Sequence, residues 1–215
     1  MNTMKTMKRH AMIYDLDDLL SRFSVSLRNH SSRVAVCSAI IAEHAGAHRN
    51  FFEVPGGASL SEAAHLGGTC HDIGKLMLPA IETKSKAYKM HPSLGADFLE
   101  KHKIEMFGEE PSAQVVTDIV RYHHERIDGA GFPAGLKGYD IPLIAGICSA
   151  ADELDYGMYL DRTQYKNETE VYMSLKAQAG KQFHECVWEL VESAWHCLSE
   201  KYVSWNRAAG NDGRE

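Results

Sequence analysis

Histidine and aspartate residues recur in this chain at the ends of predicted helices, where they could form a polar site. The clearest pair is His123-His124, which follows Val116, Ile119 and Val120 along an apolar helical stripe. Two adjacent imidazoles therefore stand where core-facing residues are expected, and burying such groups without partners costs about 1–3 kcal/mol each. Either the helix end turns toward solvent, or the pair binds something that satisfies its nitrogens.

A second candidate is the pair His71-Asp72, which closes a predicted helix and is followed by Gly74 and Lys75. A His-Asp dipeptide alone is usually structural. Here a glycine lets the chain turn just after the pair, and a lysine brings a positive charge back toward the carboxylate. The combination indicates a polar site at the end of this helix.

Asp152 is a third candidate because it follows eleven uncharged residues, 141–151, in a predicted helix rich in small side chains. Small side chains allow other elements to approach closely. We expect Glu153 and Asp155 to be the solvated acids of this helix, because each successive residue is rotated by about 100°.

The elements that position these residues are predicted to be helical almost throughout. Apolar residues recur at three- and four-residue steps, and no segment shows the sustained alternation of a strand. His30 and His91 each open a predicted helix, and either one alone is typical of a capping or surface residue. We expect an all-α fold, a compact bundle of about seven or eight helices. The first expected helix carries an apolar stripe from Ile13 to Leu27. The others are one capped by Asn29, one from Ser61 to about Asp72, one from Pro92 to about His102, one from Pro111, one from Pro142, and two over 168–179 and 183–202. Loops are expected over 103–110 and 125–140.

The composition narrows the class of protein. With 215 residues, 44% of them hydrophobic and 24% charged, the chain is suited to one globular domain of ordinary core size. The net charge of −6 argues against nucleic-acid binding, and the longest uncharged apolar stretch is too short to span a membrane. Five scattered cysteines without a Cys-x-x-Cys motif are typical of reduced thiols, and acidic residues interrupt any apolar signal near the N-terminus. We therefore expect a cytoplasmic protein.

Taken together, these residues make the chain resemble the HD-GYP family, a branch of the HD-domain phosphohydrolases. The resemblance covers about residues 25–195, and its most specific part runs from His123 to Pro142. The matching residues are His30-Ser-Ser-Arg33-Val, His71-Asp-Ile-Gly-Lys75, His91-Pro92 with Gly95, His123-His-Glu-Arg126, Asp128-Gly-Ala-Gly-Phe-Pro133, Gly135-Leu-Lys-Gly138, Ile141-Pro142 and Ala151-Asp152.

The resemblance implies a centre of two divalent metal ions, iron or manganese, with zinc or nickel as alternatives. Nitrogen and oxygen donors without thiolate suit these metals. Seven side chains and a bridging hydroxide nucleophile leave about two of twelve coordination positions for phosphate oxygens. Asp72 and Lys75 are the implied catalytic residues, with Lys75 balancing charge on the phosphate. The implied metal ligands are His30, His71, Asp72, His91, His123, His124 and Asp152, with Asp72 bridging the two ions.

The activity implied by the resemblance is hydrolysis of cyclic dinucleotides, above all cyclic di-GMP to pGpG or GMP. The implied substrate contacts are Lys75, Arg126 and Arg162, and Arg162 is shifted by one position from the family pattern. The Gly-Tyr-Pro signature reads Gly131-Phe132-Pro133 here, so the tyrosine hydroxyl is absent. Ser26 stands where some members carry a glutamate that recruits a third metal, and we therefore expect two metals.

Two other functions stay open at this point. Phe132 and the shifted Arg162 are also compatible with an effector or scaffold that binds metal and nucleotide but turns over negligibly, and the third reading is an HD-type phosphohydrolase acting on another phosphate ester. The resemblance also implies contacts with signalling proteins through the loop Asp128–Pro133, and the last helix could support a homodimer. Either the domain works alone or the chain is part of a longer protein. The expected organisation is an N-terminal helix and lead-in over 1–28, a catalytic domain over 29–205 and a flexible tail over 206–215.

Overall fold

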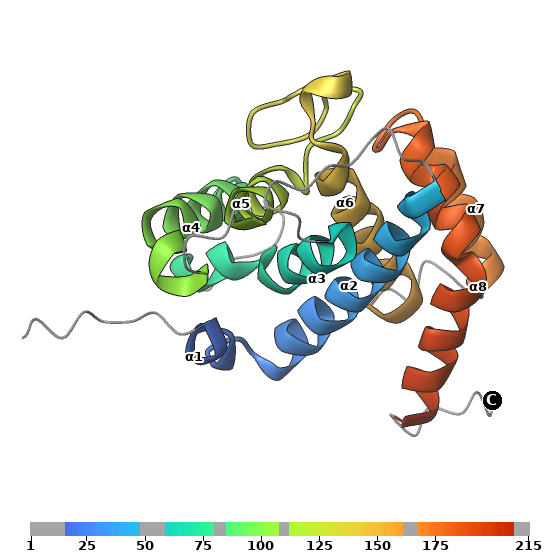
Figure 1. The fold of residues 1–215 in the computed structure, drawn as a ribbon, viewed down its shortest axis with the longest axis horizontal. Helices are drawn as coiled ribbons and strands as arrows, with labels where there is room; N and C mark the ends of the chain where they lie inside the picture. The colour runs from blue at the N-terminus through green and yellow to red at the C-terminus, as the bar shows by residue number, and fades with distance from the viewer. Residues whose placement is uncertain (1–15, 48–58, 80–84, 108–111, 161–166, 209–215) are drawn as a thin grey trace, which may run out of the picture.

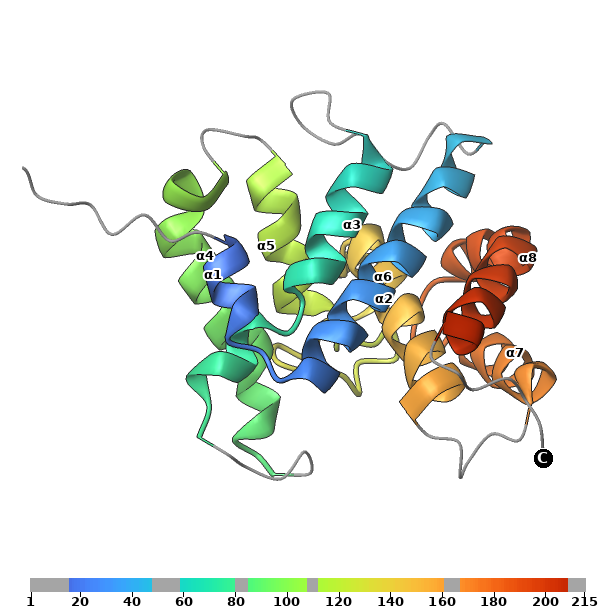
Figure 2. The same ribbon diagram turned by 90° about the horizontal axis from the view of Figure 1, so that it is seen from below.

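Helix α2 lies at the centre of the fold and packs against both α3 and α6 (Figure 1). The computed structural model describes residues 16–47, 59–79, 85–107, 112–160 and 167–208. On one side of this centre lie α1, α4 and α5, and on the other lie α7 and α8 (Figure 2). The α-helices are α1 (Leu16–Ser21), α2 (Val25–Glu43), α3 (Leu60–Cys70), α4 (His91–Phe107), α5 (Ser112–Tyr122), α6 (Leu143–Asp155), α7 (Glu168–Gln178) and α8 (Glu185–Ala208). These eight helices confirm the predicted all-α bundle, and within the described ranges there is no β-strand, only a single bridge between Ala179 and Phe183.

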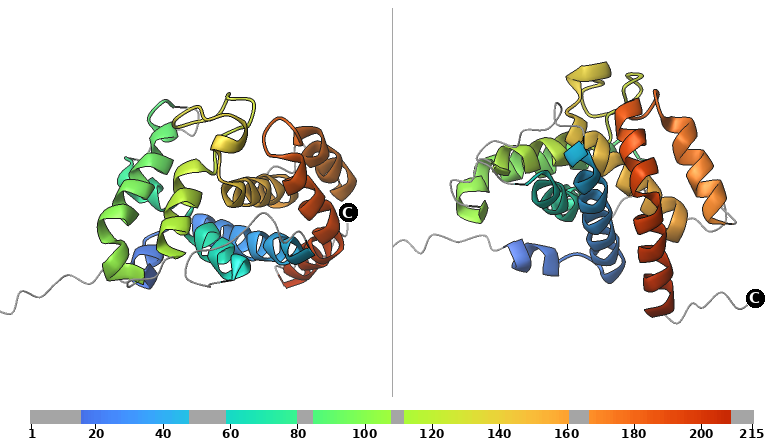
Figure 3. Two further views of the ribbon diagram at one scale, coloured as in Figure 1. Left: turned by 45° about the horizontal axis from the view of Figure 1, so that its top comes forward. Right: turned by 45° about the vertical axis from the view of Figure 1, so that its right-hand side comes forward.

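Two apolar clusters stabilise the bundle. The larger one joins α2, α6 and α8 through side chains such as Ile41, Ile147 and Leu190, and Figure 3 shows α8 alongside α2 and α6. The smaller one joins α1, α4 and α5 around Phe23 and Leu99. None of the helices in the described part of the chain has the length and apolar composition that a membrane crossing requires.

Two predicted helix starts were wrong because another residue provides the N-cap. The hydroxyl of Ser24 accepts a hydrogen bond from Leu27 N at 3.1 Å, so α2 begins at Val25 and Asn29 lies inside it. Ser59 and Glu62 form a capping box at the start of α3, two residues before Ser61. The predicted stripe from Ile13 to Leu27 is therefore divided between α1 and α2, and Ile13 lies outside the described residues.

Other boundaries differ where the sequence lacks a clear stop signal. Helix α4 continues to Phe107, although residues from Lys103 onward were expected to be a loop. Pro111 lies outside the described residues, and α5 begins at Ser112. Helix α8 extends to Ala208, so residues 206–208 are helical rather than part of a tail, and 209–215 lie outside the described ranges. Helix α6 was expected to start at Pro142, and the structure has Pro142 as its N-cap and Leu143 as its first residue. Residues 125–140 form a loop, as predicted, with one short 3-10 turn, Gly138–Asp140.

Candidate metal centre

Seven histidine and aspartate side chains from five elements converge beside the central helix. His30 lies in α2, His91 is the first residue of α4, and Asp152 lies in α6. His71 and Asp72 follow the end of α3, and His123 and His124 follow the end of α5. Residues up to 122 positions apart in the sequence thereby lie close together, and all seven predicted ligands are among them. Their role as metal ligands stays a prediction.

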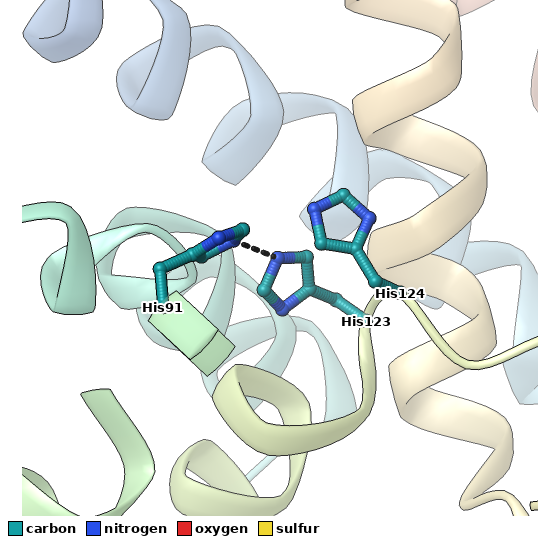
Figure 4. Close-up of side chains that lie close together, drawn as sticks. All are labelled: His91, His123 and His124. Atoms are coloured by element: carbon teal, nitrogen blue, oxygen red, sulfur yellow. Dashed lines mark hydrogen bonds between the residues drawn. The ribbon is translucent and has the colours of Figure 1, made fainter. Parts of the chain in front are cut away.

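The histidines form two clusters, each with its donor atoms within 4.8 Å of one another. The His30 cluster consists of His30, His71 and Asp152, and the His91 cluster consists of His91, His123 and His124. Figure 4 shows the three rings of the His91 cluster, with His91 and His123 directed at each other. Four of these six residues are buried, and His124 and Asp152 are partly exposed. Each cluster offers three donors to one cation.

Asp72 lies between the two clusters. Its Oδ2 is 3.3 Å from Nε2 of His71 and 3.8 Å from Nε2 of His30, whereas its Oδ1 is 3.2 Å from Nε2 of His91. The carboxylate is buried and presents one oxygen to each cluster. This arrangement is suited to a carboxylate that bridges two cations.

Backbone carbonyls orient three of the histidines. Nδ1 of His71 donates to the carbonyl of Gly68 at 2.7 Å, and Nδ1 of His91 donates to that of Tyr88 at 2.8 Å. Nδ1 of His123 donates to the carbonyl of Val120 at 2.9 Å. Because a carbonyl only accepts, Nδ1 of each ring carries a proton, and Nε2 is the nitrogen that is directed into the site. An outer hydrogen bond of this kind is the usual support of a metal-binding histidine.

Two buried atoms show that the site fits a cation. Nε2 of His71 and Oδ1 of Asp72 have no hydrogen-bond partner among the described residues. Leaving such polar groups unsatisfied in the interior costs about 1–3 kcal/mol each. A cation in the His30 cluster would satisfy Nε2 of His71, and a cation in the His91 cluster would satisfy Oδ1 of Asp72. The nitrogen and oxygen donors suit iron, manganese or zinc.

Burial and neighbouring charges set the protonation of the site. Burial lowers the pKa of His123 well below its usual value and that of His124 to about 4, so both rings are neutral. Burial alone would raise the pKa of Asp72, but His71 and Lys75 outweigh it and hold that pKa well below its usual range. The pKa of Asp152 is lowered in the same way, because the hydrogen bond with His30 and the neighbouring His71 outweigh burial. The neutral rings of His123 and His124 thus lie beside two ionised carboxylates, and these are the protonation states that metal binding requires.

His30 differs from the other histidines in its partners. Its Nε2 lies 3.1 Å from Oδ1 of Asp152, and its Nδ1 lies 2.8 Å from Oδ2 of Asp155. Burial disfavours the charged ring, but the hydrogen bonds with Asp152 and Asp155 prevail and raise the pKa of His30 to about 10. Without a cation, a proton therefore lies between His30 and Asp152, and a bound cation would replace it.

The expectation that Asp155 is a solvated acid was wrong, because its side chain is fully buried. Asp155 is three residues after Asp152, and residues at this spacing lie on the same face of a helix. Besides His30, it accepts hydrogen bonds from Arg33 Nε at 2.6 Å and from Tyr202 Oη at 3.0 Å. The three-residue spacing between Asp152 and Asp155 could have identified Asp155 as a buried residue. The prediction considered only the rotation of about 100° from one residue to the next.

The predicted basic residues have different positions. The ammonium of Lys75 pairs with Oδ2 of Asp72 at the edge of the site, and its side chain is about a quarter exposed (23%). All three guanidinium nitrogens of Arg126 are engaged, by Asp128 and Gln182. Arg162 lies outside the described residues. Substrate contacts by these residues stay predictions.

The loop after α5 is shaped by the buried carboxylate of Glu125. It accepts backbone hydrogen bonds from Ala134 at 2.6 Å, Gly135 at 3.1 Å and Leu136 at 3.0 Å. The loop places the ring of Phe132 against His124, with the ring centroids 4.7 Å apart and the planes 29° from parallel. Phe132 is therefore part of the wall of the His91 cluster.

Close packing against α4 explains why residue 74, next to the site, is a glycine. Gly74 lies in a 3-10 turn, Ile73–Met77, and a Cβ atom there would overlap the carbonyl oxygen of His91. Its φ is not positive, so the predicted role as a turn that stops α3 was wrong, and glycine is needed for contact with α4. This contact sets the position of His91 relative to Asp72.

Comparisons with known proteins agree with this geometry. The HD domain model matches residues 27–157, which include all seven candidate ligands. The chain is 30% identical over 182 residues to a protein named cyclic di-GMP phosphodiesterase from Thermotoga maritima, covering 79% of this chain and 45% of that protein. It is 26% identical over 196 residues to a protein named 3′3′-cGAMP-specific phosphodiesterase 2 from Vibrio cholerae, covering 86% of this chain and 34% of that protein.

The fold is also found in a solved structure. The structure described as Bd1817, an HDG"Y"P protein from Bdellovibrio bacteriovorus, superimposes with a TM-score of 0.60 at 20% identity, covering 80% of this chain and 52% of that chain. The chain spans less than half the length of the two curated relatives named above. Because the family model matches more than half of its residues, the chain belongs to the HD domain family.

Proposed function

We propose that the chain is a metal-dependent phosphodiesterase that hydrolyses cyclic dinucleotides, with cyclic di-GMP as the substrate. The observation that carries this proposal is the position of Asp72, which presents one carboxylate oxygen to each of two histidine clusters. Such a pair of sites suits in-line displacement at phosphorus. The names of the Thermotoga and Vibrio relatives support a cyclic dinucleotide as the substrate class.

The residues of the chain would divide the work as follows. The His30 cluster and the His91 cluster would each bind one cation, with Asp72 between them. When bound, two divalent cations supply a nucleophile from water and stabilise the charge that develops on the phosphodiester. Hydrolysis breaks the bond between phosphorus and the ribose 3′ oxygen, and water supplies the new oxygen on phosphorus and the proton on the leaving hydroxyl. The first product is a linear dinucleotide.

Lys75 would stabilise the anionic substrate. Its ammonium is paired with the buried Asp72 carboxylate, and this neighbour, together with Tyr88, raises the pKa of Lys75 despite burial. The lysine therefore stays charged throughout the neutral range. Because part of its side chain faces solvent, a phosphate oxygen that approaches the edge of the site would meet this charge.

Phe132, in the wall of the His91 cluster, bears on the two alternative functions, an effector and a phosphohydrolase acting on simple esters. Phe132 stacks on His124 and has no hydroxyl to offer to a substrate. The missing hydroxyl favours an effector that binds metal and nucleotide with negligible turnover. The loop Asp128–Pro133, which carries Phe132, argues against a phosphohydrolase acting on simple esters.

One assay distinguishes these functions. Protein reconstituted with Mn²⁺ or Fe²⁺ is incubated with cyclic di-GMP, with 3′3′-cGAMP and with bis(p-nitrophenyl) phosphate, and Asp72→Ala protein is the control. Turnover of cyclic di-GMP that is absent in Asp72→Ala supports the proposal. Nucleotide binding without turnover supports the effector, and turnover of the simple ester alone supports a general phosphohydrolase.

A further inference from the structure

Tyr202 of α8 is connected to the His30 cluster by hydrogen bonds through Asp155. Its hydroxyl donates to Oδ1 of Asp155 at 3.0 Å, and Oδ2 of the same carboxylate accepts from Nδ1 of His30 at 2.8 Å. Tyr202 is buried, with 1% of its surface exposed, although it is near the end of a 24-residue helix. It also lies well beyond residues 27–157, the segment that matches the HD domain.

Arg33 completes the environment of Asp155. Its Nε donates to Oδ1 at 2.6 Å and its Nη2 donates to Oδ2 at 2.9 Å, while its guanidinium lies 3.8 Å from the centre of the Tyr159 ring. Each carboxylate oxygen thus accepts two hydrogen bonds, which uses all of its ordinary acceptor capacity. The Asp155 carboxylate is therefore fixed in one orientation, and with it the ring of His30.

The support of His30 differs from that of the other oriented histidines. His71, His91 and His123 donate to carbonyl groups of the main chain, which no side-chain substitution removes. His30 depends instead on one side chain, Asp155. Among these four histidines, His30 is therefore the one whose orientation can be changed by substituting the residue that supports its Nδ1.

We propose that Tyr202 is a positioning residue of the metal centre, which fixes Asp155 and thereby directs Nε2 of His30 toward the cation of the His30 cluster. This inference rests on the proposed two-cation centre. It assigns to α8 a role in metal binding at one of the two clusters. Loss of an outer partner of a metal ligand lowers metal affinity about 10- to 100-fold.

The test is a titration of metal-free protein with Mn²⁺, in which bound ions are counted by electron paramagnetic resonance. Wild-type protein is expected to bind two ions. Tyr202→Phe, which keeps the ring and removes only the hydroxyl, is expected to weaken one binding step about fivefold and leave the other unchanged. Asp155→Asn is expected to weaken the same step about 10- to 100-fold. Tyr172→Phe is the matched control, because the Tyr172 hydroxyl bonds to the exposed Glu192.

Two further backgrounds identify the affected cluster. In His124→Ala protein, the His30 cluster is the remaining complete site. Adding Tyr202→Phe to this protein is expected to weaken binding of the one remaining Mn²⁺ ion. In His71→Ala protein, where the His91 cluster is the remaining complete site, adding Tyr202→Phe is expected to change nothing. If the effect appears in the His71→Ala background, or if both steps weaken equally, Tyr202 has only a structural role and the inference is overturned.

The failure of this inference is distinct from failure of the proposed function. Wild-type protein that binds two Mn²⁺ ions, together with unchanged binding by Tyr202→Phe, overturns the positioning role alone. Wild-type protein that binds fewer than two ions overturns the two-cation centre, and the positioning role with it. Circular dichroism verifies that each variant is folded. Should Asp155→Asn fail to fold because Arg33 is left unpaired, Tyr202→Phe still decides the outcome.

Discussion

Nε2 of His91 lies 3.3 Å from Nε2 of His123, although both rings donate their proton through Nδ1 to main-chain carbonyls. Two ring nitrogens therefore face each other in a buried space. Nε2 of His123 offers a lone pair there, because burial lowers the pKa of His123 well below the usual value and keeps that ring neutral. A cation bound beside these two nitrogens would gain two of its ligands from them.

Binding of metal should therefore stabilise the fold. With free Mn²⁺ about 100-fold above the dissociation constant, each occupied site adds about 2.7 kcal/mol, which raises the melting temperature by roughly 5–10 °C for a chain of this size. Differential scanning calorimetry of chelator-treated and Mn²⁺-loaded protein measures the shift. Asp72→Ala protein, which lacks the carboxylate between the clusters, should show a much smaller one. An unchanged wild-type melting temperature would contradict the metal centre.

Removal of one imidazole should remove one ion. His124→Ala eliminates a donor of the His91 cluster, so bound Mn²⁺ should fall from about two ions per chain to about one. Elemental analysis after desalting counts the ions. His65→Ala is the matched control, because His65 is exposed on α3, and it should retain the wild-type content. Equal metal content in the two variants would exclude His124 as a ligand.

The contact of Gly74 with α4 predicts a selective effect of one methyl group. Gly74→Ala should lower the free energy of unfolding by about 2–3 kcal/mol, because the new Cβ overlaps the carbonyl oxygen of His91 and main-chain atoms must move. Gly146→Ala is the control inside α6, where the nearest atom, Cγ2 of Val187, would lie 3.3 Å away. Alanine there also favours the helix, so its effect should stay within about 1 kcal/mol. Urea unfolding compares the two variants, and equal stability would refute the contact.

Thiol reactivity should follow burial. Burial raises the pKa of Cys37 and Cys70 to about 12 and raises that of Cys148 well above its usual value, so at pH 8 these thiols are protonated and shielded. Cys186 is partly buried with a raised pKa, whereas Cys197 is exposed. With a chromogenic disulfide reagent, native protein should show one fast thiol, Cys197, and a slower one, Cys186.

The remaining three thiols should react only after unfolding in urea. Cys197→Ser should abolish the fast phase without changing the others. A fast phase that persists in this variant would show that the packing around a second cysteine is looser than in the structure.

The positions of the candidate ligands were easier to predict than the interactions that support them. His71 and Asp72, or His123 and His124, are adjacent in sequence and belong to motifs with specific neighbours, so their convergence could be predicted from the chain. The bond between Tyr202 and Asp155 joins residues 47 positions apart with no local pattern, and only the packing of α8 against α6 brings them together.

Helix ends show a similar limit. Ser24 and Asn29 are both good N-cap residues, and the sequence alone does not choose between them. Burial of Phe23 in the smaller apolar cluster fixes the chain just before Ser24, which makes Ser24 the cap. Tertiary packing therefore determines which of the two possible N-cap residues begins α2.

The single carboxylate of Glu125 holds the main chain of residues 134–136 by three hydrogen bonds. The side chain of Ala134 is exposed, so this order does not depend on it. A change of side chain at Ala134 would therefore alter the outer surface of the loop at small cost in stability and leave the buried histidine clusters as they are.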